Sequence, residues 1–236
     1  MTKTADDMIR LLPLNITEEY SLQRKNPGLV IIDEVNGFCT QGNLAPPPAD
    51  PVIKEMLSRT NKLAELWGER PILAFLDTHA PNKPEFPYPP HCVAGSGEEN
   101  LVAELSWMEQ DLEAFTSIRK NCINGIIGSI DDGRIRFLDW VNEHKLDTLV
   151  VVGICTDICV MQFVQAVLSC SNHGLLPTLI KVVIYTKACA TYDLPAEALN
   201  ELGLPATAAH PRDLTQHLGL YLMQQSGAIL TEKIVF

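Results

Sequence analysis

The chain has 236 residues, of which 46% are hydrophobic, and its 18 basic and 29 acidic residues give a formal net charge of −11. This length suits one large α/β domain, and the hydrophobic content is high enough for a full core. The basic residues form no cluster that would build the positive face of a nucleic-acid binder, so we expect no nucleic-acid partner.

The N-terminal ten residues include Asp6 and Asp7 and lack the apolar core of a signal peptide. No run approaches the roughly 20 apolar residues of a membrane span, so we expect no membrane partner. The seven cysteines are odd in number within a long chain, which does not favour a disulfide framework. We therefore expect a cytoplasmic protein, although the sequence leaves the nucleus or an organelle open.

Residues 1–27 are predicted to form an N-terminal extension, with a short helix near Ala5–Leu12 and then irregular chain that covers a sheet edge or joins a subunit contact. Residues 28–236 are predicted to form a single domain in which apolar runs alternate with helical patterns. The expected strands are Leu29–Ile32, Pro71–Leu76, Phe115–Arg119, Leu146–Val152, Lys181–Thr186 and a short one within Ala228–Phe236. The expected helices are Pro51–Gly68, Ile135–His144, Thr156–Asn172 and most of Pro205–Gln225.

This alternation predicts an α/β fold, with a parallel sheet covered by helices on both faces. In such sheets ligands bind at the carboxyl ends of the strands. Four segments with reactive side chains follow predicted strands, and we expect them to meet there: Asp33, Asp77 with His79, Lys120, and the turn from Cys155 to Cys159.

The turn Gly153–Val160 joins a predicted strand directly to a predicted helix, and it places Cys159 in the first helical turn. Unpaired backbone N–H groups and the helix dipole favour an anion there, which biases a thiol toward thiolate. Thr156 and Asp157 are suitable capping residues for such a start. The turn indicates a catalytic cysteine; the alternative is a small buried hydrophobic residue.

Asp33 ends an apolar strand, where a carboxylate can serve as general base for a cysteine or simply cap a loop. Lys120 is either a solvated surface charge or, beside Asp33 and Cys159, the partner of the carboxylate.

Asp77 and His79 are two residues apart at an extended strand end, so their side chains point the same way. Glu85 and His91 lie in the proline-rich loop that follows. Two histidines and two carboxylates bind Zn²⁺, Mn²⁺ or Fe²⁺, although each histidine alone is also typical of an ordinary loop.

Five runs of the sequence resemble the nicotinamidases (pyrazinamidases) of the isochorismatase-like cysteine hydrolase superfamily, in the order and spacing of that family. They are Leu29–Phe38, Phe75–His79, Tyr88–Cys92, Arg119–Gly128 and Val151–Val160. The resemblance implies a three-layer, Rossmann-like sandwich with a six-stranded, mostly parallel sheet. It places a catalytic triad on Asp33, Lys120 and Cys159, and metal ligands on Asp77, His79 and His91.

Glu85 falls where many members carry a third ligand histidine. The resemblance also implies that Phe38 and Tyr88 pack against the substrate ring. A cis peptide bond is implied at Ile154–Cys155, where it would aim the N–H groups of Cys155 and Cys159 at an oxyanion. Two departures concern substrate preference: Asp33 begins an unusual first motif, and Ile158 replaces a common histidine before the nucleophile.

The activity implied is hydrolysis of nicotinamide to nicotinate and ammonia through a cysteine thioester, in NAD salvage. The cofactor implied is one divalent metal ion, with Zn²⁺ preferred over Mn²⁺ or Fe²⁺. Two alternatives stay open, a sister amidohydrolase of N-carbamoyl or ureido compounds that needs no metal, and a non-catalytic relative. We also expect a homo-oligomer, because symmetric assemblies are common among such enzymes.

Overall fold

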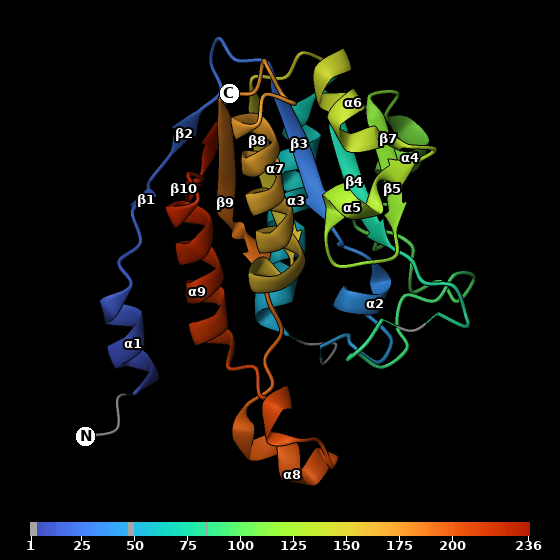
Figure 1. Ribbon diagram of the computed structural model, residues 1–236, viewed down its shortest axis with the longest axis vertical. Coiled ribbons are helices and arrows are strands. Elements are labelled where there is room, and N and C mark those ends of the chain that lie inside the picture. Colours follow the sequence, from blue (N-terminus) through green and yellow to red (C-terminus); the bar gives the residue numbers. More distant parts are fainter. Residues whose placement is uncertain (1–3, 47–49, 84) are drawn as a thin grey trace.

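The computed structural model describes residues 4–46, 50–83 and 85–236 (Figure 1). At its centre lies a seven-stranded sheet in the order β1-β10-β9-β8-β3-β4-β5, and every neighbouring pair in it is parallel. In that order the strands are Ile16–Thr17, Ile229–Thr231, Lys181–Ala190, Thr148–Ile154, Pro27–Ile32, Ile72–Asp77 and Phe115–Lys120.

Three adjacent interior strands, β8, β3 and β4, are buried along their whole length. Continuous runs of Val, Ile and Leu form such strands because helices exclude water from both faces of the sheet. Their registers place Ile32 beside Gly153 on one side and beside Phe75 on the other, so the three strands end at the same edge.

Helices cover both faces of this sheet (Figure 1). On one face α3 (Pro51–Trp67) buries a cluster with the side chains of Leu29 and Ile31. The opposite face carries a second cluster around Val30 and Ile32, and its helices are α5 (Gly125–Gly128), α6 (Arg136–Glu143), α7 (Met161–Asn172) and α9 (Arg212–Gln225). The predicted α/β sandwich with helices on both faces is therefore confirmed.

The sheet has seven strands where six were expected, because the N-terminal residues contribute one. After α1 (Ala5–Leu11), the structure has two short strands in place of irregular chain. Strand β1 pairs with β10 at the sheet edge, and β2 (Tyr20–Ser21) pairs with β11 (Ile234–Val235). These residues thus cover the edge of the sheet, one of the two roles left open by the sequence.

Most predicted elements match the structure to within two residues at each end, and three differ by more. Strand β9 continues beyond Thr186 to Ala190. The helix predicted from Thr156 begins with a π-helical turn, η1 (Thr156–Val160), before α7. The helix predicted from Pro205 begins only at Arg212.

The remaining elements are short, and they are α2 (Asn36–Cys39), α4 (Trp107–Asp111), β6 (Ile130–Asp131), β7 (Arg134–Ile135), η2 (Ala196–Ala198), α8 (Leu199–Leu202) and η3 (Ala206–Ala208). Within the described ranges, none of the helices combines the length and apolar character needed to cross a membrane.

Candidate active site

Three charged side chains meet where β3, β4 and β5 end. Asp33 directly follows β3, Asp77 is the last residue of β4, and Lys120 is its register partner at the end of β5. All three are at least 98% buried. The topology of parallel neighbours therefore brings together residues that are far apart in the sequence.

The ammonium group of Lys120 lies between the two carboxylates. Its Nζ is 2.8 Å from Asp33 Oδ2 and 3.0 Å from Asp77 Oδ1, and it also donates to the carbonyl of Cys122 at 3.0 Å. Burial alone would lower the pKa of Lys120, but Asp33, Cys159 and Asp77 raise it well above its ordinary value. Lys120 is therefore a cation at every physiological pH.

Asp33 is poised as a base. Its backbone is in the left-handed region, with φ of 53°, and its N–H donates to the carbonyl of Phe75 at 3.0 Å. Burial raises the pKa of Asp33 to about 6 against the opposing effect of Lys120. Among the described residues, Oδ1 has no hydrogen-bond partner, which leaves this atom free to accept a proton.

Cys159 lies in η1 with its Sγ 3.9 Å from Lys120 Nζ. Burial, followed by the charge of Asp33, raises the pKa of this thiol well above 9, and Lys120 offsets only part of the effect. The expectation that a helix start biases this thiol toward thiolate is therefore wrong here. A neutral thiol needs a base, and Asp33 is the nearby group able to act as one.

The turn that carries Cys159 is shaped by close packing against β3. Gly153 has φ of 127°, and a Cβ at this position would lie 2.1 Å from the carbonyl oxygen of Ile32. The next peptide bond, Ile154–Cys155, is cis. The carbonyl of Cys155 accepts from the N–H groups of Ile158 at 3.0 Å and Val160 at 3.2 Å, a pair that does not include the N–H of Cys159.

A second cluster lies on the other side of Asp77. Asp77 Oδ2 is 2.8 Å from His79 Nε2 and 3.2 Å from His91 Nε2. The potential ligand atoms of these three buried residues all lie within 4.8 Å of one another. Glu85 Oε2 is farther away, 3.9 Å from His79 Nε2 and 3.7 Å from His91 Nε2.

This donor set fits a divalent cation. The Nδ1–H of His91 donates to the carbonyl of Pro89 at 2.8 Å, which directs Nε2 toward Asp77, where a bound cation would take the place of a proton on Nε2. Burial would raise the pKa of Asp77, but Lys120 and the two histidines hold it well below its usual range, so it is an anion. A carboxylate and two imidazoles that converge in this way suit Zn²⁺, Mn²⁺ or Fe²⁺.

Backbone pairing fixes the loop that supplies His91. The N–H of His79 donates to the carbonyl of Cys92, and the N–H of Ala94 donates to the carbonyl of His79, each at 2.9 Å. The N–H of Cys92 in turn donates to Glu98 Oε2 at 2.9 Å. These bonds attach the proline-rich loop to the end of β4, so both histidines keep their positions.

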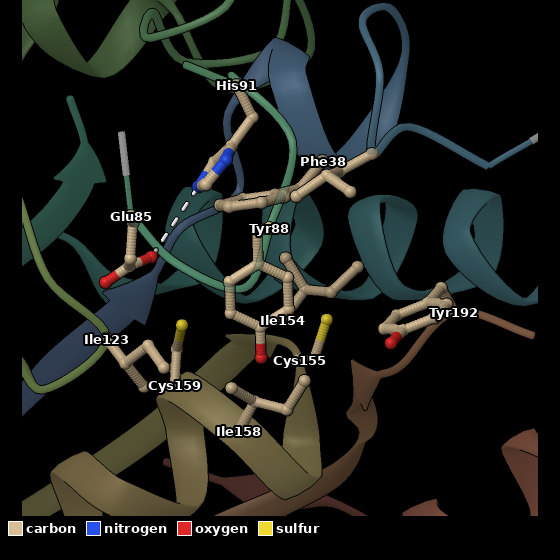
Figure 2. Close-up of a pocket in the computed structure, with 11 residues that line it drawn as sticks. Phe38, Glu85, Tyr88, His91, Ile123, Ile154, Cys155, Ile158, Cys159 and Tyr192 are labelled. Atoms are coloured by element: carbon tan, nitrogen blue, oxygen red, sulfur yellow. Dashed lines mark ion pairs between the residues drawn. The ribbon is translucent and has the colours of Figure 1, made fainter. Parts of the chain in front are cut away.

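Above these charged groups lies a largely apolar pocket of about 470 Å³, open mouth included (Figure 2). Seven of the residues singled out from the sequence line it: Phe38, Glu85, Tyr88, Ile154, Cys155, Cys159 and His91. The centroids of the Phe38 and Tyr88 rings lie 5.5 Å and 6.0 Å from that of His91. The pocket therefore connects Cys159 with the cluster around Asp77.

Sequence reasoning missed three lining residues, Leu44, Ile123 and Tyr192, and it treated Ile158 only as a departure from the family pattern. Tyr192 follows β9 by two residues. The rule that located Asp33 at a strand end would also have located Tyr192 if β9 had been extended beyond Thr186.

A cysteine, a buried acid and a buried lysine at the carboxyl edge of a parallel sheet are the parts of a candidate cysteine hydrolase site. The sequence model of the isochorismatase domain matches residues 27–231, and the chain belongs to this family.

Nicotinamidase 1 of Arabidopsis thaliana is 44% identical over 237 residues, which cover 98% of this chain and 96% of that protein. The structure of PnC1 from L. infantum in complex with nicotinate aligns with a TM-score of 0.65 at 18% identity, over 94% of this chain and all of that one. The pyrazinamidase of Pyrococcus horikoshii in complex with zinc aligns with a TM-score of 0.61 at 18% identity, over 89% and 99% of the two chains. At this level of identity, the two structures show a shared fold.

Proposed function

We propose that this protein is a nicotinamidase, which hydrolyses nicotinamide to nicotinate and ammonia and thereby serves NAD salvage. The observation that carries the proposal is the single buried network in which Lys120 joins Asp33 to Asp77, with Cys159 on one side and the two histidines on the other. The full-length similarity to the Arabidopsis nicotinamidase supports the same activity.

In the proposed reaction, Asp33 takes the proton of the Cys159 thiol, and the thiolate attacks the carboxamide carbon. The N–H groups of Cys155 and Cys159 donate to the oxyanion. Asp33 then gives its proton to the departing nitrogen, and ammonia leaves behind a thioester on Cys159.

Water completes the cycle. Asp33 takes a proton from the water that attacks the thioester, the same proton returns to Cys159 Sγ, and the acid product loses its own proton to solvent and leaves as nicotinate. Lys120 remains a cation throughout and offsets the negative charge that passes between Asp33 and the reacting atoms. Each role follows from a group whose protonation state is set by burial and by its neighbours.

We propose that Asp77, His79 and His91 hold one divalent metal ion, with Zn²⁺ the preferred ion and Glu85 an additional ligand. When bound, the ion supplies a Lewis-acidic anchor for the ring nitrogen of the substrate, directly or through water. Phe38 and Tyr88 line the pocket beside His91, where they can pack against a planar aromatic ring.

Two broader properties belong to the same proposal. All seven cysteines are free thiols, which suits a reducing compartment such as the cytoplasm. A symmetric homo-oligomer is the expected state in solution, and its native mass can be measured directly.

Ammonia release from nicotinamide tests the proposed activity, with N-carbamoyl compounds as competing substrates. We expect rapid release from nicotinamide alone. Rapid release from the N-carbamoyl compounds, by protein that binds no metal, would instead assign the chain to the sister amidohydrolases.

A further inference from the structure

Tyr192 forms one end of the pocket, opposite Glu85 (Figure 2). It lies just beyond β9, whose last residue, Ala190, pairs with Ile154 at the end of β8. Tyr192 therefore reaches the pocket from the strand next to the one that leads into Cys159. No step of the proposed reaction uses this side chain, so its role must lie in the shape of the pocket.

One imidazole holds both the ring and the backbone of Tyr192. The rings of Tyr192 and His210 are stacked, with centroids 3.9 Å apart and planes inclined by only 13°. The Nδ1–H of His210 donates to the carbonyl of Tyr192 at 3.0 Å. A ring that is packed on one face and tied through its own backbone has little freedom to turn away from the pocket.

His210 is itself held by the helix that carries the nucleophile. Its Nε2 lies 2.8 Å from Oδ2 of Asp157, two residues before Cys159. Carbonyl and carboxylate oxygens only accept hydrogen bonds, so both ring nitrogens of His210 carry protons and the ring is a cation. Although burial lowers the pKa of His210, the pairing with Asp157 raises it above its ordinary value. A cation stacked on a tyrosine ring adds a cation–π attraction.

The carboxylate of Asp157 has a fixed position. Helix α9 passes so close that a Cβ on Gly219 would lie 2.7 Å from the Cα of Asp157. On the other side, His210 and Leu194 exchange both backbone hydrogen bonds, at 2.7 Å and 2.9 Å, and close the base of the segment 194–210. The ion pair thus connects two anchored parts of the chain.

We propose that Asp157 and His210 are positioning residues that hold Tyr192 as the wall that limits the size of the carboxamide reaching Cys159. The inference rests on the proposed function and deepens it, since it assigns the site to small, unsubstituted aromatic carboxamides. Asp157 acts through His210, and His210 acts through Tyr192. The contribution of each of these residues can therefore be tested by replacing that residue alone.

The test compares nicotinamide with 5-methylnicotinamide. In Tyr192→Ala, His210→Ala and Asp157→Ala, KM for nicotinamide rises and kcat changes little, because the wall is lost and the reacting groups remain. The ratio of kcat/KM for the methylated over the unsubstituted substrate rises about tenfold, the scale of one methyl group in an apolar pocket.

Non-additivity separates positioning from general damage. The double variant Tyr192→Ala/His210→Ala has the selectivity ratio of Tyr192→Ala alone, because in this account His210 limits the substrate only through Tyr192. Tyr192→Phe keeps the wild-type ratio, since the ring forms the wall. His217→Ala is the control histidine; it lies on helix α9, which begins two residues after His210, and its Nε2 contacts the carbonyl of Leu12. An unchanged ratio in the three single variants, or additive effects in the double, would overturn the inference.

A second measurement does not depend on the proposed reaction. Alkylation of Cys159 by iodoacetamide and by the larger N-phenyl iodoacetamide is followed on the peptide that contains this residue. Each single variant should raise the rate of Cys159 alkylation by N-phenyl iodoacetamide relative to the rate with iodoacetamide. If wild-type protein releases no ammonia from nicotinamide, the proposed function fails, and the alkylation ratio still decides whether Tyr192 is the wall.

Discussion

The two sides of the site are built in different ways. Asp33, Asp77 and Lys120 end three neighbouring strands, are buried, and hold one another through ion pairs of 2.8 Å and 3.0 Å. The other side, with Ile158 and Tyr192, is largely apolar and comes from η1 and the chain after β9. The charged side sets the protonation states of the reacting groups, and the apolar side sets the shape of the pocket.

This difference separates the consequences of substitution. A change on the charged side leaves a buried group without its partner, which affects both chemistry and stability. A change on the apolar side alters the space available to the substrate and leaves the proton transfers intact. Large effects on rate are therefore expected from the charged groups and Cys159, and smaller effects on selectivity from the apolar wall.

Replacement of the nucleophile gives the largest effect. Cys159→Ala should lower kcat for nicotinamide by about 10⁴-fold or more, because it removes the covalent route. The matched control is Cys170→Ala, which should retain activity. Cys170 lies on helix α7, which directly continues the turn that carries Cys159. Retention of more than about a tenth of the rate in Cys159→Ala would refute the assignment.

Loss of the central cation comes next. Lys120→Met leaves Asp33 and Asp77 buried together, and it should lower the free energy of unfolding by about 3–5 kcal/mol, as when one partner of a buried ion pair is removed. Urea unfolding measures the change, and the exposed Lys181→Met serves as control. The deficit should shrink as the pH falls toward about 6, the pKa of Asp33 in the intact protein, because loss of Lys120 raises that pKa further and the neutral acid needs no counterion. A deficit below about 1 kcal/mol, typical of a surface ion pair, would contradict the buried network.

Loss of a metal ligand should affect substrate binding more than the chemical step. His91→Ala should lose most of its bound metal and raise KM about tenfold or more, because the substrate ring loses its anchor. Metal analysis and steady-state kinetics on the same samples provide the test, with the exposed His173→Ala as control. Unchanged metal content in His91→Ala would exclude this residue as a ligand.

The prediction with the smallest effect on activity at neutral pH concerns the titration of Asp33, which changes kcat/KM at lower pH. Its pKa is raised to about 6, and only the ionised form can take the thiol proton. The value of kcat/KM should therefore be level above this pH and fall about tenfold for each pH unit below it. Metal content measured at each pH separates this loss from metal release. A flat profile down to pH 5 would remove Asp33 as the base.

The same two sides differ in how far the sequence predicts them. Asp33 and Asp77 each follow an apolar run of four or more residues, and Lys120 follows the more polar predicted strand Phe115–Arg119; parallel strands must bring such positions to one edge. The charged side was predicted as a cluster for this reason. Its protonation states were not, because the pKa of Cys159 depends on burial and on three neighbours from other strands.

The apolar side depends on contacts that have no local pattern. Tyr192 is held by His210, which lies 18 residues away, and Asp157 pairs with this histidine in place of capping its own helix. The π-helical turn at Thr156–Val160 is only five residues long, too short for its apolar spacing to be distinguished from that of an α-helix. Likewise, Ile16–Thr17 is a strand only because it pairs with β10, and two exposed residues carry no signal of their own.

The most direct test of the account is ammonia release from nicotinamide, measured on protein as purified and after removal of metal by a chelator, with metal analysis of both samples. We predict rapid release by the metal-bound protein, loss of activity with the metal, and recovery when Zn²⁺ is added. No release from nicotinamide by metal-bound protein would contradict the account, because the charged network and the pocket above it would then serve a different substrate.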